Sequence, residues 1–280
     1  MQPTSADGAD ASNLDPMVPP GAPAAAEPAP QPDHLQRLCE QGQQQLMAMD
    51  YLAAEASLVE AEAIALALGD FVTLGRLYFP LQEARRQKRQ LCGEGIVRLD
   101  LIATGPAEEP DPFAIVEQIP QGQLLVAGWA SIEPAVRLRQ LIVEHKRYLE
   151  TFLAAAYSVG DENDPASRVV AIVPTADVEL PPAEAGRSGL DDLQKQLPPH
   201  TLLLPVVELP TGPTPGTAVT FEQTMSMWER LAAPFLASAK QTPALAARLE
   251  AYRRTIEVDY ACEKAHQWLA SDALAAGRGD

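Results

Sequence analysis

Two continuous apolar runs, residues 124–130 and 169–173, mark the part of the chain around which the rest is organised. Neither run alternates with polar residues, which is typical of strands that helices cover on both faces. Between them, residues 132–157 carry apolar side chains, among them Leu138 and Ile142, at helical spacing. A strand, a long helix and a strand in this order predict a βαβ unit with parallel strands.

Two further strands are predicted beside this unit. Residues 96–103 alternate apolar and polar side chains, which indicates a strand with one wet face or at an edge. Residues 201–209 form the other strand, and Pro205 places it at an edge or a bulge because proline donates no ladder hydrogen bond. We therefore expect an α/β fold with a small, mostly parallel four-stranded sheet and flanking helices. The strands of the βαβ unit should be central, with right-handed crossovers.

The chain divides into three parts. Residues 1–33 are rich in proline and alanine and nearly free of large apolar side chains, so we expect a disordered tail. Residues 34–93 contain a helical hairpin and a third helix. Residues 94–280 hold the predicted sheet and end in long helices.

Small residues recur in the predicted hairpin where its two helices should touch. Gly42 is followed twelve positions later by Ala54, with Tyr51, Leu58 and Ala61 at the intervening and following positions. This spacing resembles a tetratricopeptide repeat, a 34-residue helical hairpin. The resemblance covers residues 35–70 and implies a surface that binds peptides or partner proteins.

The match to the repeat is partial. Leu38 and Gln41 stand where the family has an early tryptophan and the following leucine, and Gln45 replaces its middle tyrosine. The next repeat's glycine falls at Gly75, one position early. An ordinary helical hairpin packed on the next domain is the alternative.

Net charge and cysteine usage indicate which partners and which cellular compartment to expect. A formal net charge of −17 and a pI near 4.6 argue against nucleic acid or an anionic membrane as the main partner. Cys39, Cys92 and Cys262 are far apart and odd in number, which is typical of reduced thiols in the cytoplasm. No stretch approaches the roughly 18 apolar residues that span a bilayer, and no signal-peptide pattern is present. We therefore expect a cytoplasmic protein.

Hydroxyl and acidic side chains follow the predicted strands, where open α/β sheets bind ligands. The candidates for a small-molecule crevice that could take a phosphate, sugar or cation are Ser131, Asp177, Thr211, Thr214 and Thr217. Turn formation explains these residues equally well.

Familiar chemical motifs are absent from the sequence. It has no glycine-rich nucleotide-binding motif and no serine-nucleophile elbow. Cys262 and His266 share a predicted helix face, but a metal site needs further converging ligands. We assign no catalytic residue, metal ligand or cofactor, and leave open whether the protein is an enzyme.

One basic cluster, Arg85, Arg86, Lys88 and Arg89, ends the third predicted helix. Cations at this place complement the helix dipole, so a solvated helix end is expected. Contact with an acidic partner is the alternative.

These patterns favour a non-enzymatic cytoplasmic protein that binds other proteins or acts as a scaffold. The alternative is a small-molecule-binding domain or enzyme that uses the strand-end crevice, and a third possibility is that the helices only brace the domain. An interaction protein should expose an apolar groove along the hairpin. A hairpin face packed against the sheet would contradict the hypothesis of an interaction protein.

Overall fold

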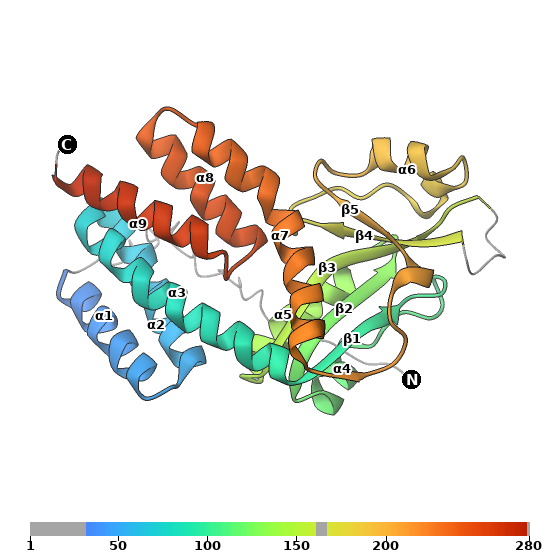
Figure 1. Ribbon diagram of the computed structural model, residues 1–280, viewed down its shortest axis with the longest axis horizontal. Helices are drawn as coiled ribbons and strands as arrows, with labels where there is room; N and C mark the ends of the chain where they lie inside the picture. The colour runs from blue at the N-terminus through green and yellow to red at the C-terminus, as the bar shows by residue number, and fades with distance from the viewer. Residues whose placement is uncertain (1–31, 161–166, 279–280) are drawn as a thin grey trace, which may run out of the picture.

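The computed structural model describes residues 32–160 and 167–278. The predicted tail, residues 1–33, lies outside the described residues except for its last two, which begin the first helix. Figure 1 shows a helical body on one side and a sheet with its covering helices on the other. The α/β class expected from the sequence is confirmed.

The helical body contains both ends of the described chain. Its helices are α1 (Pro32–Met47), α2 (Tyr51–Leu68), α3 (Phe71–Glu94), α8 (Leu245–Val258) and α9 (Glu263–Arg278). The long helix α7 (Ala218–Gln241) crosses the sheet and enters this body at its C-terminal end, where Ala239 joins the core.

The strands of the described residues form one sheet in the order β5-β4-β3-β2-β1-β6. Their bounds are β1 Ile96–Ile102, β2 Gln121–Trp129, β3 Tyr148–Ser158, β4 Arg168–Val173, β5 Leu202–Pro205 and β6 Thr214–Pro215. Strand β2 is parallel to β1 and β3, and the other pairings are antiparallel. The sheet is therefore six-stranded and mixed, not four-stranded and mostly parallel.

The difference arises in the segment predicted as one long helix. Helix α5 ends at Glu144, Lys146 takes a left-handed conformation (φ 50°), and β3 begins at Tyr148. Strand β3 alternates between two buried layers: Leu149 and Leu153 pack on one side of the sheet, while Phe152 and Ala154 pack on the other. Because both faces of the strand are buried and apolar, its sequence does not alternate between apolar and polar residues, and this signal of a strand is missing.

This extra strand changes the strand order. β3 pairs with both β2 and β4, so the two apolar runs that opened the sequence analysis are not neighbours. β4 returns antiparallel to β3, which replaces the expected crossover with a hairpin-like connection. The predicted central pairing of those two strands is wrong.

Helices cover both faces of the sheet (Figure 1). On one face α7 places Trp228 against Phe152, with ring centroids 4.1 Å apart. On the other face α4 (Pro112–Gln118) and α5 (Glu133–Glu144) form a second apolar layer with β2 and β3. The short helix α6 (Leu190–Gln196) adds Leu193 to a third cluster beside β4.

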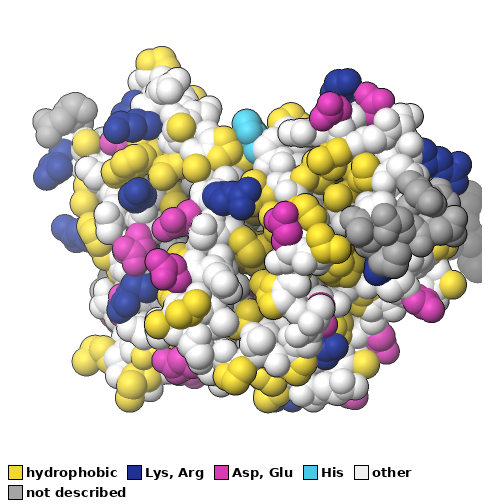
Figure 2. All heavy atoms as spheres, turned by 45° about the vertical axis from the view of Figure 1, so that its right-hand side comes forward, with side chains coloured by type: hydrophobic (Ala, Val, Ile, Leu, Met, Phe, Trp, Pro, Cys, Tyr) yellow, Lys and Arg dark blue, Asp and Glu magenta, His cyan; other side chains and the backbone are white. Residues whose placement is uncertain are grey.

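Surface charges are dispersed on the face shown in Figure 2. Basic side chains lie scattered among acidic and hydrophobic ones there and do not gather into a patch. Within the described ranges, no helix combines the length and apolar character needed to span a bilayer.

Helices α1 and α2 touch at Gly42. A Cβ atom built on Gly42 would lie 2.6 Å from Cγ of Leu58, so only a residue without a side chain fits this approach. One turn away, Ser57 donates a hydrogen bond from Oγ to Gln45 Oε1 at 2.8 Å. The closest contact of the hairpin thus falls at the small residue that the sequence singled out.

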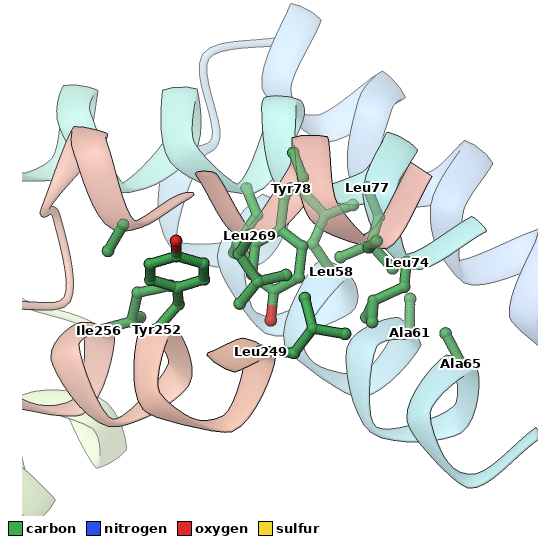
Figure 3. Packing of buried hydrophobic residues seen from close by; sticks show 14 of the residues in the cluster. Leu58, Ala61, Ala65, Leu74, Leu77, Tyr78, Leu249, Tyr252, Ile256 and Leu269 are labelled. Carbon is green, nitrogen blue, oxygen red and sulfur yellow. The ribbon is translucent and has the colours of Figure 1, made fainter. Parts of the chain in front are cut away.

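The inner face of the hairpin is buried within the helical body. Leu58 and Ala61 of α2 share one core with Leu77 of α3, Leu249 of α8 and Leu269 of α9 (Figure 3). Other helices therefore fill the side of the hairpin on which the sequence analysis expected an open groove.

Substituting Gly42 tests this close approach. Gly42→Val should destabilise the protein by about 1–3 kcal/mol because its side chain must displace Leu58 in a packed core. The matched variant Gln44→Val, on the exposed side of the same helix, should change stability by less than about 1 kcal/mol. Urea unfolding measures both, and equal stability of the two variants would contradict the packing described.

Candidate functional site

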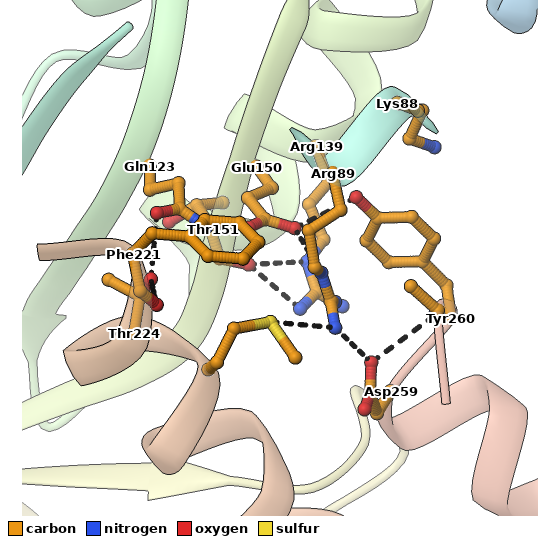
Figure 4. Close-up of polar contacts among 12 residues, drawn as sticks. Lys88, Arg89, Gln123, Arg139, Glu150, Thr151, Phe221, Thr224, Asp259 and Tyr260 are labelled. Atoms are coloured by element: carbon orange, nitrogen blue, oxygen red, sulfur yellow. Dashed lines mark hydrogen bonds and ion pairs between the residues drawn. The ribbon is translucent and has the colours of Figure 1, made fainter. Parts of the chain in front are cut away.

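A buried polar cluster lies where the helical body meets the sheet, and Arg89 of α3 is at its centre (Figure 4). Arg89 Nε donates to Glu150 Oε2 of β3 at 3.2 Å, and Nη1 donates to Asp259 Oδ1 at 2.7 Å. All three side chains are nearly inaccessible to solvent, with exposed fractions of 3–5%. One cation thus bridges two carboxylates from separate parts of the chain.

Two aromatic rings lie close to the guanidinium of Arg89. Its central carbon lies 4.9 Å from the ring centroid of Trp228 and 4.6 Å from that of Tyr260. Tyr260 also donates from its hydroxyl to Glu150 Oε2 at 2.8 Å. Such cation–π contacts gain strength when they are desolvated, as here.

The hydrogen-bond network continues from Glu150 into the sheet and α7. Gln123 of β2 donates from Nε2 to Glu150 Oε1. Thr224 of α7 donates to Gln123 Oε1 at 2.7 Å, which fixes the orientation of the amide. Glu150 therefore accepts from Arg89, Tyr260 and Gln123, and its charge is compensated within the protein.

The surroundings fix the protonation states of Arg89 and Tyr260 at neutral pH. Burial by itself would lower the pKa of Arg89, but the adjacent Glu150 and Asp259 raise it well above its usual value. Burial, followed by the charge of Glu150, raises the pKa of Tyr260 well above that of an ordinary tyrosine. Tyr260 thus remains a hydrogen-bond donor, and Arg89 remains a cation.

Arg139 of α5 adds a second, partly buried cation near this cluster. Its Nε and Nη2 both donate to the backbone oxygen of Thr151, at 3.1 and 2.8 Å. Burial lowers the pKa of Arg139 to about 10, which still leaves it protonated at neutral pH.

Two buried donors of the cluster have no hydrogen-bond partner among the described residues: Arg89 Nη2 and Trp228 Nε1. Most buried polar groups in proteins are satisfied, so these two atoms are exceptions to that rule. Both donors belong to side chains that contact each other.

A cleft of about 620 Å³ opens beside the cluster. Residues of α3, of α7 and of the turn between α8 and α9 line it, and Arg89 and Asp259 belong to that lining. A volume of this size lies within the usual range of small-molecule pockets. Among the described residues, no group of three or more His, Cys, Asp or Glu side chains is placed to hold a metal ion.

The basic cluster of the sequence is mostly internal. Besides Arg89, Arg85 is buried and donates from Nε to Glu55 Oε1 of α2 at 3.0 Å, and Lys88 also bonds Glu55. Only Arg86 extends to the surface, where it pairs with Glu83. The expectation of a solvated helix end therefore holds for Arg86 alone, and Arg85 and Arg89 are too buried to face a partner.

His266 of α9 completes the internal network. Its Nδ1 lies 2.8 Å from the backbone oxygen of Cys262, and its Nε2 lies 3.1 Å from Arg85 Nη1. The carbonyl can only accept and the guanidinium can only donate, so the ring carries its proton on Nδ1 and is neutral. Burial, reinforced by the charge of Arg85, lowers the pKa of His266 to about 4.

The strand-end candidates are not gathered into one crevice. Ser131 follows the end of β2, and its Oγ accepts from the backbone N–H of Glu133. Thr214 belongs to β6, which pairs with the start of β1, and its hydroxyl donates to the backbone oxygen of Val97. Thr217 caps α7 by accepting from the N–H of Thr220. These hydroxyls serve local structure at different ends of the sheet.

The remaining two candidates also lie apart. Asp177 is exposed in the segment after β4, which leaves the sheet in the direction opposite to β2 and β3 because β4 is antiparallel. Thr211 is exposed beside Gly212, whose N–H donates to Asp100 Oδ2 at 2.7 Å.

Comparison with known proteins gives no relative: no family model, curated protein or solved structure matches this chain.

The histidine geometry predicts a pH dependence of stability. The pKa of His266 is about 4 in the folded state and about 6.5 in an unfolded chain, so the unfolded state binds the proton first as pH falls. The contribution of neutral His266 to the free energy of unfolding is fully present above pH 6.5 and is lost progressively as the pH falls to 4. Between pH 7 and pH 5 the wild-type protein should lose about 2 kcal/mol more than His266→Gln.

Urea unfolding at pH 7, 6 and 5 measures this difference. Parallel pH profiles for His266→Gln and wild type would show that His266 titrates normally.

Proposed function

We propose that this protein is a non-enzymatic interaction protein that binds another protein through the solvent-facing side of α2. The supporting observation is the composition of this helix, which is apolar on its exposed side as well as on its buried side. The exposed side includes Ala56, Val59, Ala63, Ala67 and Leu68. A helix that is apolar all round is usually buried, so a second surface is needed to cover it.

The polar residues of α2 strengthen this proposal. Glu55 and Glu62 bond side chains of the same protein, Glu55 with Arg85 and Lys88, Glu62 with Tyr78. Glu60, which contacts His34 Nε2 at 3.2 Å, is the acidic side chain among the exposed apolar positions. A partner that covers this side therefore has little charge to desolvate.

The end of α1 and the turn that precedes α2 add exposed apolar area. Met47 and Met49 are 85% and 71% exposed. Methionine is adaptable and suits surfaces that pack against a partner. The resemblance of the hairpin to a tetratricopeptide repeat agrees with this role, although the proposed surface is the outer side of the hairpin and not its buried inner face.

We further propose that this function is carried out in the cytoplasm. The cysteines Cys39, Cys92 and Cys262 form no disulfide, which suits a reducing compartment.

The test places a photo-cross-linking amino acid at Ala63 in the full-length protein and in a version carrying Val59→Lys. Cross-linking is carried out in the native cell extract and with the purified protein alone, and it should give a defined adduct. Val59→Lys should abolish this adduct, because the ammonium group of the new lysine would have to be desolvated in the contact. The purified sample identifies a second copy of this chain as partner.

The matched control places the same cross-linker at Ser271 and the same lysine at Gln267, which are exposed on α9 with the same spacing of four. Identical adducts from α2 and α9, or none from α2, would contradict the proposed surface. Both lysine variants should unfold within about 0.5 kcal/mol of wild type, since all these positions are exposed.

A further inference from the structure

An apolar stripe of α7 forms one wall of the cleft beside Arg89. Phe221, Met225, Ala232 and Leu236 all line this cleft, and their spacing of four, seven and four residues places them on one face of the helix. From Phe221 to Leu236 the helix rises by about 22 Å. The cleft is therefore long, and its long axis follows α7.

The cleft is narrow for its length. A volume of about 620 Å³ spread over about 22 Å gives a mean cross-section of about 28 Å², so the cleft is about 5 Å wide. A helix with its side chains measures about 10–12 Å across and is too thick to enter. A single hydrocarbon chain fits this width, because carbon atoms that are not bonded to each other pack at separations of about 3.5–4.0 Å.

The turn between α8 and α9 contributes further apolar atoms to the lining, from Ala261 and Cys262. Burial raises the pKa of the Cys262 thiol above its usual value, so the thiol is uncharged at neutral pH. A protonated cysteine behaves as a small hydrophobic side chain. Apolar groups from two separate parts of the chain therefore line the cleft.

The charged side chains of the cleft do not require an ionic ligand. Arg89 and Asp259 bond each other, and Arg86 pairs with Glu83 of its own helix. The remaining charged residues of the lining are exposed to solvent, and they are Glu229, Glu263 and Lys264. The formal net charge of −17 on the whole chain also repels an anion that approaches from solution. A neutral ligand complements this lining.

We propose that this cleft binds a neutral molecule with a linear alkyl or acyl chain. The chain lies along α7 and packs on Phe221, Met225, Ala232 and Leu236, and an uncharged polar head group reaches the solvent. This site goes beyond the interaction surface on α2, since residues of α3, of α7 and of the α8–α9 turn line it and none of the α2 residues does.

Calorimetric titration of the full-length protein with three ten-carbon probes tests this assignment. 1-Decanol is linear and neutral, 1-adamantanol holds the same number of carbon atoms and the same hydroxyl in a compact cage, and decanoate keeps the linear chain but carries a negative charge. 1-Decanol should bind, and each of the other two should bind at least tenfold more weakly. No binding of 1-decanol, or equal binding of 1-adamantanol or decanoate, would overturn the proposal.

Two variants of α7 locate the chain. Ala233 and Ala237 are both exposed on this helix, one turn apart, and Ala233 lines the cleft whereas Ala237 does not. Ala233→Asp should weaken binding of 1-decanol at least tenfold, because the chain would have to desolvate the new carboxylate. Ala237→Asp is the matched control and should bind 1-decanol as the wild type does. Both proteins should fold, since both positions are exposed. Equal binding by wild type and Ala233→Asp would place the ligand elsewhere and overturn the assignment.

Discussion

The contact of Arg89 with Glu150 and Asp259 is the interaction on which the arrangement of the two bodies depends. Arg89 comes from the helical body, Glu150 from the central strand β3, and Asp259 from the end of α8. Removing such charges from water costs several kcal/mol per ion, and the pair attraction offsets this only with good geometry and further hydrogen bonds. The rings of Trp228 and Tyr260 and the donors around Glu150 provide these. Loss of one partner would leave a buried charge without compensation.

This contact also explains where the proposed binding surface and the cleft lie. Helix α3 extends from the helical body to the sheet, so its inward side chains are used for internal bonds and its outward ones are few. The same packing buries the inner face of the hairpin and leaves the outer side of α2 uncovered. The cleft beside Arg89 forms because α7 and the α8–α9 turn approach α3 from different directions. The proposed binding surface on α2 and the cleft beside Arg89 are therefore separate places on one framework.

The sequence predicted those features that depend on local pattern, and it missed those that depend on tertiary contact. The α/β class, the strands around residues 96, 124 and 169, and the close approach at Gly42 follow from apolar runs and residue size. Strand β3 was missed because Leu149, Phe152 and Leu153 have helical spacing, and the three alanines that follow favour a helix. Because Glu150 was assigned to a helix, the sequence indicated no buried acidic partner for Arg89. The basic cluster was therefore interpreted as a surface feature. Nothing in the sequence indicates that Asp259 returns to α3.

The most direct test of this account is a double-mutant cycle in unfolding experiments with Arg89→Leu, Glu150→Leu and the combined variant, since Glu150 is the partner that the sheet provides. The account predicts that each single variant loses about 3–5 kcal/mol, and that the double variant loses much less than the sum, with a coupling of about 2 kcal/mol or more. Arg86→Leu, one turn earlier on α3 and exposed, is the control and should lose less than about 1 kcal/mol. Additive losses for Arg89 and Glu150, or an Arg89→Leu variant as stable as Arg86→Leu, would contradict the claim that this buried contact joins the two bodies.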